Sequence, residues 1–214
     1  MIESIADSLS FVVLASCFGL AVVRALRTRS TAWLMIVLFY GCMLMGNAYW
    51  LGYLLVFGET PRYSNISELS WIAAYVFLLM LEIESDRLRA ISAPVPVTWI
   101  PVVACAVCGV YFIANYGSVL INIADEGLLG AAGYFAVRGL VAQPEDSASG
   151  GLAYNRRFHA AVLVFVFVEL ALWVASCFVD PGPIQSVNAY IVLNYALALS
   201  TISILVCAWK SDDL

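Results

Sequence analysis

The chain has 214 residues, of which 63% are apolar and 12% are charged, and its mean hydropathy is +0.93. Soluble domains average roughly 45–50% apolar and about 25% charged residues, so this composition excludes an ordinary water-soluble domain. The net charge of −5, from ten basic and fifteen acidic residues, argues against a nucleic-acid-binding protein, which needs a concentrated basic surface. We therefore expect a lipid bilayer as the main partner and no nucleic acid.

Seven segments are long and apolar enough to cross a membrane as helices. A bilayer core about 30 Å thick needs roughly 20 apolar residues per helix at about 1.5 Å per residue. The connections are too short to fold alone, so residues 1–214 are expected to form a single domain, an all-α integral membrane protein built as a seven-transmembrane-helix bundle. The predicted helices are Leu9–Leu26, Ala32–Phe57, Leu69–Leu88, Val97–Tyr116, Val119–Val141, Phe158–Val179 and Val187–Trp209.

The basic residues indicate how this bundle is oriented. All but Arg62 of the ten lysine and arginine residues fall on one side of the predicted membrane. Because basic residues favour the cytoplasmic side, we expect the N-terminus outside and the C-terminus in the cytoplasm of a bacterial inner (plasma) membrane. Glu3 and Asp7 precede the first predicted helix where a signal peptide would carry basic residues, so this helix is expected to be retained.

A few polar side chains fall inside the predicted helices. Within a membrane each of them needs a hydrogen-bond or ion-pair partner, a protonated and uncharged state, or a water-filled cavity. Carboxylates and carboxamides on four helices share the outer half of the predicted bundle, with aromatic residues at helical spacing beside them. An acidic pocket with aromatic walls suits a small cationic or amphipathic ligand, through ion pairing and cation–π contact. The predicted ligand-binding residues are Glu169, Asp125, Glu126, Asn47, Asn194, Trp50, Trp173, Tyr190 and Tyr195.

The same polar residues also allow a structural interpretation. They can hydrogen-bond to one another across helices, with Glu169 protonated and uncharged. Helical spacing alone does not establish whether their helix faces converge, so both interpretations stay open. In the fifth predicted helix, Gly127, Gly130 and Gly133 form a stripe of small residues that favours close helix packing.

The sequence carries no motif of a known catalytic or cofactor site. It has no GxSxG, no HExxH, no P-loop and no dinucleotide-binding fingerprint, and Lys210 lies after the last predicted helix, where it cannot hold retinal. We therefore predict no cofactor, no metal and no catalytic residues. All six cysteines fall inside predicted helices and are expected to be free. The single histidine, His159, is expected at the membrane interface.

Charged residues also collect near the inner end of the third predicted helix. Glu82 and Glu84 run into Asp86 there, and Arg24 or Arg138 is within reach as an ion-pair partner. We expect these charged residues to form a ring of solvated or ion-paired side chains, which we call the collar. The alternative is that they form the exit of a pathway for protons or cations.

Within residues 47–81, seven residues carry a resemblance to a known family, namely Trp50, Tyr53, Pro61, Ser67, Glu68, Trp71 and Tyr75. With them this segment resembles part of the seven-transmembrane input (sensor) domains of bacterial signalling proteins, which precede diguanylate cyclase or kinase modules. The resemblance covers about one sixth of the chain, and the sequence ends five residues after Trp209. It therefore implies either an excised sensor region or a stand-alone membrane module that signals through a partner. It implies sensing at an outer loop and at the pocket beneath it.

The leading hypothesis is a membrane-embedded sensory or small-molecule-binding protein without enzymatic activity, with a ligand pocket in the outer half of the bundle. It would signal through a cytoplasmic or membrane partner. One alternative is a small transporter or proton-coupled carrier that uses Glu169, Asp125 and Glu126 as titrating groups. Further alternatives are an intramembrane lipid-acting hydrolase and a membrane anchor of an oxidoreductase.

Overall fold

The computed structural model describes residues 2–59, 61, 65–89, 96–141, 155–179 and 187–210, and no strand occurs in these ranges. Seven helices are long and apolar enough to cross a membrane, as predicted. One short 3₁₀ helix, η1, leads into the fourth of them. The elements are α1 (Ile2–Thr28), α2 (Thr31–Phe57), α3 (Asn65–Arg89), η1 (Pro96–Trp99), α4 (Ile100–Tyr116), α5 (Val119–Val141), α6 (Arg156–Ser176) and α7 (Ala189–Trp209).

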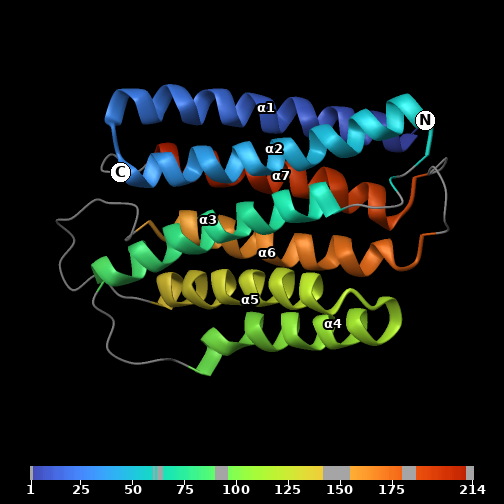
Figure 1. Cartoon of the computed structure of the whole chain (residues 1–214). Coiled ribbons are helices and arrows are strands. Elements are labelled where there is room, and N and C mark those ends of the chain that lie inside the picture. The colour runs from blue at the N-terminus through green and yellow to red at the C-terminus, as the bar shows by residue number, and fades with distance from the viewer. Residues whose placement is uncertain are drawn as a thin grey trace.

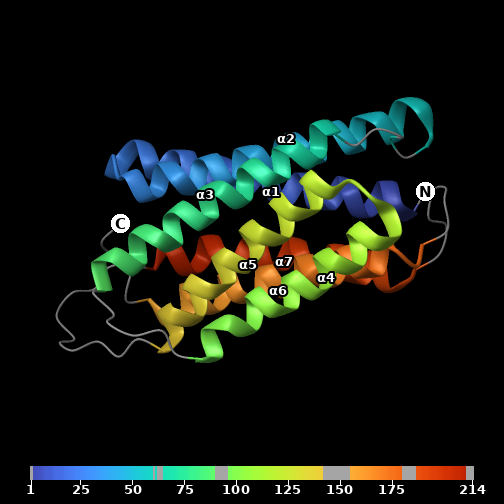
Figure 2. The ribbon, with the colours of Figure 1, turned by 60° about the horizontal axis from the view of Figure 1, so that its bottom comes forward.

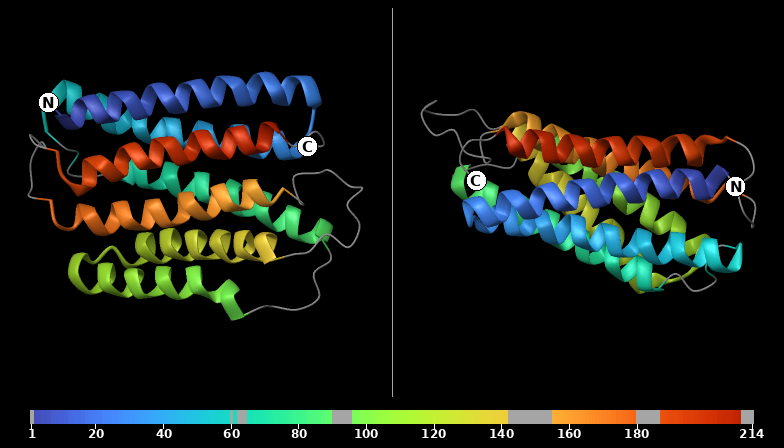
Figure 3. Two further views of the ribbon diagram at one scale, coloured as in Figure 1. Left: turned by 180° about the vertical axis from the view of Figure 1, so that it is seen from behind. Right: turned by 90° about the horizontal axis from the view of Figure 1, so that it is seen from above.

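Successive helices run in opposite directions, so each helix starts at one of two ends of the bundle (Figure 1). We call the end that contains Ile2 the N-terminal end and the opposite one the C-terminal end. Six helices form a closed ring in which α1 contacts α2 and α7, α3 contacts α2 and α5, and α6 contacts α5 and α7. Helix α4 lies outside this ring and packs mainly on α5 (Figures 2 and 3).

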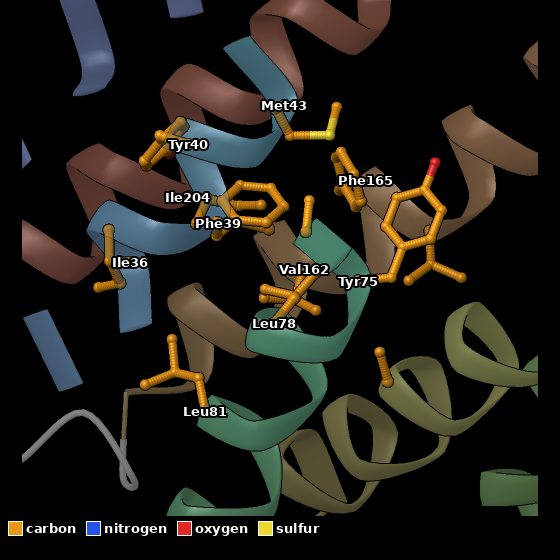
Figure 4. Packing of buried hydrophobic residues seen from close by; sticks show 14 of the residues in the cluster. Ile36, Phe39, Tyr40, Met43, Tyr75, Leu78, Leu81, Val162, Phe165 and Ile204 are labelled. Atoms are coloured by element: carbon orange, nitrogen blue, oxygen red, sulfur yellow. The ribbon is translucent and has the colours of Figure 1, made fainter. Parts of the chain in front are cut away.

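The core lies where α2, α3 and α6 meet inside the ring. Phe165 of α6 packs edge-on against Phe39 of α2 and Tyr75 of α3. Leu78 and Val162 fill the next level toward the C-terminal end, and all five side chains are buried (Figure 4). Such apolar packing excludes water from the interface between α3 and α6, except where polar groups interrupt it.

Helix α1 begins seven residues before the predicted boundary at Leu9, so the expectation that Glu3 and Asp7 precede the helix is wrong. Both side chains are buried in the first two turns of α1. Asp7 Oδ1 accepts a hydrogen bond of 2.9 Å from Asn194 Nδ2 of α7. The hydropathy pattern places these acids outside the helix, because a charged residue is assumed to be in water and a partner that is distant in sequence is not considered.

Helices α4 and α5 form a tight antiparallel hairpin whose connection is only two residues long. Gly117 and Ser118 both adopt positive φ angles, of 77° and 50°, which reverses the chain direction within two residues. On α5, a Cβ atom at Gly130 would lie 3.3 Å from Val102 Cα, and one at Gly133 would lie 2.6 Å from Pro101 Cβ. These two glycines confirm the predicted close packing, whereas Gly127 has nothing within 4 Å.

The outer surface is apolar and suits contact with lipid. Large hydrophobic side chains are exposed on the outside of the bundle, including Leu120 (83% exposed) on α5 and Val110 (70%) on α4. Soluble monomers rarely expose extended apolar surface of this kind. The basic residues in the described helices and turns all lie toward the C-terminal end of the bundle, including Arg89 at the end of α3. Arg62 is outside the described residues.

Candidate ligand-binding site

Glu169 lies on α6, two turns before this helix ends at Ser176. Its buried carboxyl group accepts a hydrogen bond of 2.5 Å from the hydroxyl group of Tyr75 on α3. The Tyr75 hydroxyl points away from the apolar side chains of the core (Figure 4). The second oxygen of Glu169, Oε2, makes no hydrogen bond of ordinary geometry with the described residues, although the indole N–H group of Trp173 is near enough to act on the carboxyl group as a donor. The tyrosine thus holds the carboxyl group in place and leaves part of its accepting capacity free.

Asp125 and Glu126 lie on α5, two turns after its start at Val119, and both side chains are buried. Glu169 is close enough to interact electrostatically with each of them. One oxygen on each side chain, Asp125 Oδ1 and Glu126 Oε2, has no hydrogen-bond partner within the described ranges. We call Glu169, Asp125 and Glu126 the central acidic cluster. No basic side chain of the described part of the chain is among the groups that act electrostatically on these three acids.

Helix α4 covers the outer side of this cluster. Glu126 interacts with Cys105, and its Cγ atom would lie only 3.2 Å from a Cβ atom at Gly109. The glycine therefore makes room for the glutamate side chain between α4 and α5. Two of the small residues that allow these helices to approach, Gly109 and Cys105, thus also form the wall of the acidic cluster.

A row of tryptophans leads to the same cluster from α2. The rings of Trp50 and Trp71 are 6.2 Å apart, and those of Trp71 and Trp173 are also 6.2 Å apart and nearly perpendicular. Trp173 lies one turn after Glu169 on α6. Trp71 packs so closely on α2 that a Cβ atom at Gly46 would lie 2.5 Å from its Nε1 atom. Of these three rings, Trp50 and Trp173 were among the predicted site residues and Trp71 was not.

Asn194, another predicted site residue, belongs to a separate polar network between α1 and α7. Its carboxamide donates to Asp7, as described above, and accepts a hydrogen bond of 3.1 Å from the Ser10 hydroxyl group. Tyr190, one turn earlier on α7, interacts electrostatically with Asp7 and also with Glu169. Tyr190 is therefore near both this network and Glu169 of the central acidic cluster.

The remaining predicted residues contribute less to the cluster. Asn47 donates a hydrogen bond of 3.1 Å to the Met43 carbonyl oxygen of its own helix. Tyr195 packs with Ile191 and Ala6 in a small apolar group near the N-terminal end. The predicted single pocket is thus divided into the central acidic cluster with its tryptophan row, the network around Asn194, and these two peripheral residues.

His159, which we expected at the membrane interface, lies in the first turn of α6, and its side chain is buried inside the bundle rather than exposed at its surface. Its side chain is 0% exposed, and Nδ1 lies 2.9 Å from Oε2 and 3.1 Å from Oε1 of Glu82, which is also 0% exposed. The predicted collar therefore contains one fully buried pair. Farther along α3, Asp86 accepts a bond of 3.0 Å from Arg138, which confirms one of its two predicted partners.

Within the described ranges, no group of three or more His, Cys, Asp or Glu residues is arranged to hold a metal ion. The six cysteines are free, as expected. Comparison with known proteins gives no match to a family model, to a curated protein or to a solved structure. The residues themselves therefore define the class of protein, an all-helical bundle with seven helices of membrane-spanning length, and the resemblance of residues 47–81 to sensor domains stays a prediction.

Proposed function

We propose that this chain is a membrane-embedded binding protein of the sensory kind, whose central acidic cluster binds a small cation. In this proposal the N-terminal end faces the outside of a bacterial inner membrane, and a partner at the C-terminal end receives the signal. One observation carries the proposal. Glu169, Asp125 and Glu126 are buried together without a described basic neighbour, and each has one oxygen that makes no hydrogen bond of ordinary geometry with the described residues.

Such an arrangement is costly unless something compensates it. A buried polar atom without a partner costs about 1–3 kcal/mol, and neighbouring carboxylates repel one another when they are ionised. A bound cation supplies both the missing contacts and the opposite charge. The free oxygens of the cluster can thus be the acceptors for an ammonium group or for a proton.

The tryptophan row favours an organic cation. An indole ring attracts a cation that lies within about 6 Å of its centre, and the interaction is stronger where water is excluded. Trp173 is one turn from Glu169, and Trp71 is packed against it. Carboxylate oxygens and indole rings together are the groups that recognise alkylated ammonium compounds.

Choline and its neutral analogue 3,3-dimethyl-1-butanol differ mainly in charge, so they test the ion pairing and the cation–π contact of this proposal. Methylammonium, whose nitrogen carries N–H donors, tests the contact with the free carboxylate oxygens. We expect choline to change the indole fluorescence of the detergent-purified protein saturably, and the neutral analogue to bind at least tenfold more weakly. Glu169→Gln keeps the size of the side chain and removes its charge, so choline should bind to this variant tenfold or more weakly.

Glu84→Gln is the matched control, because Glu84 is exposed near the C-terminal end, and it should change the choline affinity less than twofold. Two results would contradict the proposal. One is equal binding of choline and the neutral analogue, and the other is the absence of any saturable response to choline or methylammonium in the unaltered protein.

A second candidate function, a proton-coupled carrier, is favoured by the second polar pair on the same two helices. Glu82 and His159 join α3 to α6, two to three turns from Tyr75 and Glu169, with buried apolar side chains between the two pairs. Polar groups on both sides of an apolar layer are a feature expected of a transport path. Uptake of labelled choline into proteoliposomes under a pH gradient separates the two functions, because a sensor should bind choline and move none.

A further inference from the structure

Arg24 lies near the C-terminal end of α1 and contacts two tryptophan rings. Its guanidinium carbon is 5.2 Å from the ring centre of Trp209 on α7 and 6.0 Å from that of Trp33 on α2. The two rings pack against each other edge-on, with centres 5.7 Å apart. Three helices therefore meet around one arginine side chain, far from the central acidic cluster.

Two hydrogen-bond donors in this group have no acceptor within the described ranges. They are Arg24 Nε and Trp33 Nε1, and both atoms are buried. Trp33 is fully buried as a whole side chain, so surrounding solvent does not satisfy its N–H group. A buried donor without an acceptor costs about 1–3 kcal/mol, and more when the donor is charged. Both unsatisfied groups need the same kind of partner, an acceptor, and the arginine favours an acceptor with negative charge.

The start of α2 adds backbone N–H donors without a side-chain cap near the same place. Trp33 is the third residue of this helix. The N-cap residue, Ser30, makes no side-chain hydrogen bond to the helix, so the first backbone N–H groups of α2 lack the usual cap. The free N–H groups at the start of a long helix attract anions. Arg27 and Arg29, both exposed, add positive charge nearby.

We propose that Arg24, Trp33, Trp209 and the uncapped start of α2 form a binding site for a phosphate group, either in the headgroup of an anionic lipid or as a free phosphate ion. A phosphate oxygen can accept from the forked guanidinium group, from an indole N–H group and from backbone N–H groups at a helix start. Tryptophans at the end of a membrane-spanning bundle lie at the level of lipid headgroups. This site is independent of the proposed cation site.

Calorimetric titration of the protein in dodecyl maltoside separates the two sources of phosphate. The titrants are dihexanoyl phosphatidylglycerol, the zwitterionic dihexanoyl phosphatidylcholine and inorganic phosphate, at one ionic strength. We expect saturable binding of phosphatidylglycerol, weaker binding of phosphatidylcholine, and a tenfold or greater loss of affinity in Arg24→Gln. Saturable binding of inorganic phosphate with the same dependence on Arg24 would instead identify a free phosphate ion as the ligand.

The controls separate a defined site from general attraction between charges. Arg27→Gln removes the same charge one turn later on α1, at an exposed position, and should change the affinity less than threefold. Trp33→Phe keeps an aromatic side chain, although a smaller one, and deletes the N–H donor, so it should weaken binding severalfold. If Arg24→Gln does not fold, Arg24→Lys keeps the charge without the fork and should still weaken binding. Equal effects of the Arg24 and Arg27 variants, or no saturable binding of any phosphate compound, would overturn the proposal.

Discussion

Replacing Glu82 by leucine should lower the free energy of unfolding by about 3–5 kcal/mol. The substitution leaves the imidazole of His159 fully buried without the carboxylate that lies 2.9 Å from it. Removing one member of a buried pair costs more than the pair contributes, because the remaining polar group loses that contact at a site where water does not replace it. Unfolding of the purified protein with sodium dodecyl sulfate, followed by circular dichroism, measures the change.

Two further variants make this experiment specific. Glu84→Leu alters an exposed side chain two residues later on α3 and should change the stability by less than about 1 kcal/mol. In the double variant Glu82→Leu/His159→Leu neither polar group remains, so it should be more stable than Glu82→Leu alone. Equal losses at positions 82 and 84 would show that the buried pair contributes no more than a surface charge.

Replacing Gly133 by alanine should destabilise the protein by about 1–3 kcal/mol, because the added methyl group meets α4. Its Cβ atom would lie 2.6 Å from Pro101 Cβ and 3.5 Å from Val166 Cγ1. Proline is rigid, so the two helices must move apart. The thermal unfolding midpoint of the detergent-purified variant measures this effect.

Gly127→Ala is the matched control on the same helix, because nothing lies within 4 Å of the position that its Cβ atom would occupy. Alanine also favours helical backbone more than glycine does. We expect the unfolding midpoint of Gly127→Ala to stay the same or to rise. A comparable drop in both variants would mean that α5 requires glycine for a reason other than contact with α4.

Hydropathy was sufficient to predict the helices, since lipid solvation and the 1.5 Å rise per residue together fix how long an apolar segment must be. The predicted segment Val119–Val141 coincides with α5, and the close packing of Gly130 and Gly133 follows from their small size. Helix starts such as Ile2 were misplaced because a buried acid with a partner on another helix looks like a flanking charge in a linear sequence.

The polar partners could not be predicted in the same way. Tyr75 lies 94 residues before Glu169, and Glu82 lies 77 residues before His159, so no local pattern connects the members of either pair. Tyr75 entered only through the resemblance to sensor domains, although a tyrosine inside an apolar segment is itself a sign that its hydroxyl group needs a partner. His159 was assigned to the interface because a single histidine close to Arg156 and Arg157 resembles a solvated helix end.

The position of α4 outside the ring has a consequence for the topology. Helices α3 and α5 are neighbours in the ring and both start at the N-terminal end, so they run parallel to each other. A chain that leaves α3 at the C-terminal end must first return across the whole thickness of the bundle before α5 can begin, and α4 is this return passage. Without α4, helix α5 would run in the opposite direction, and Asp125 and Glu126 would lie at the other end of the bundle from Glu169. The most peripheral helix therefore determines that these three acids share one level of the bundle.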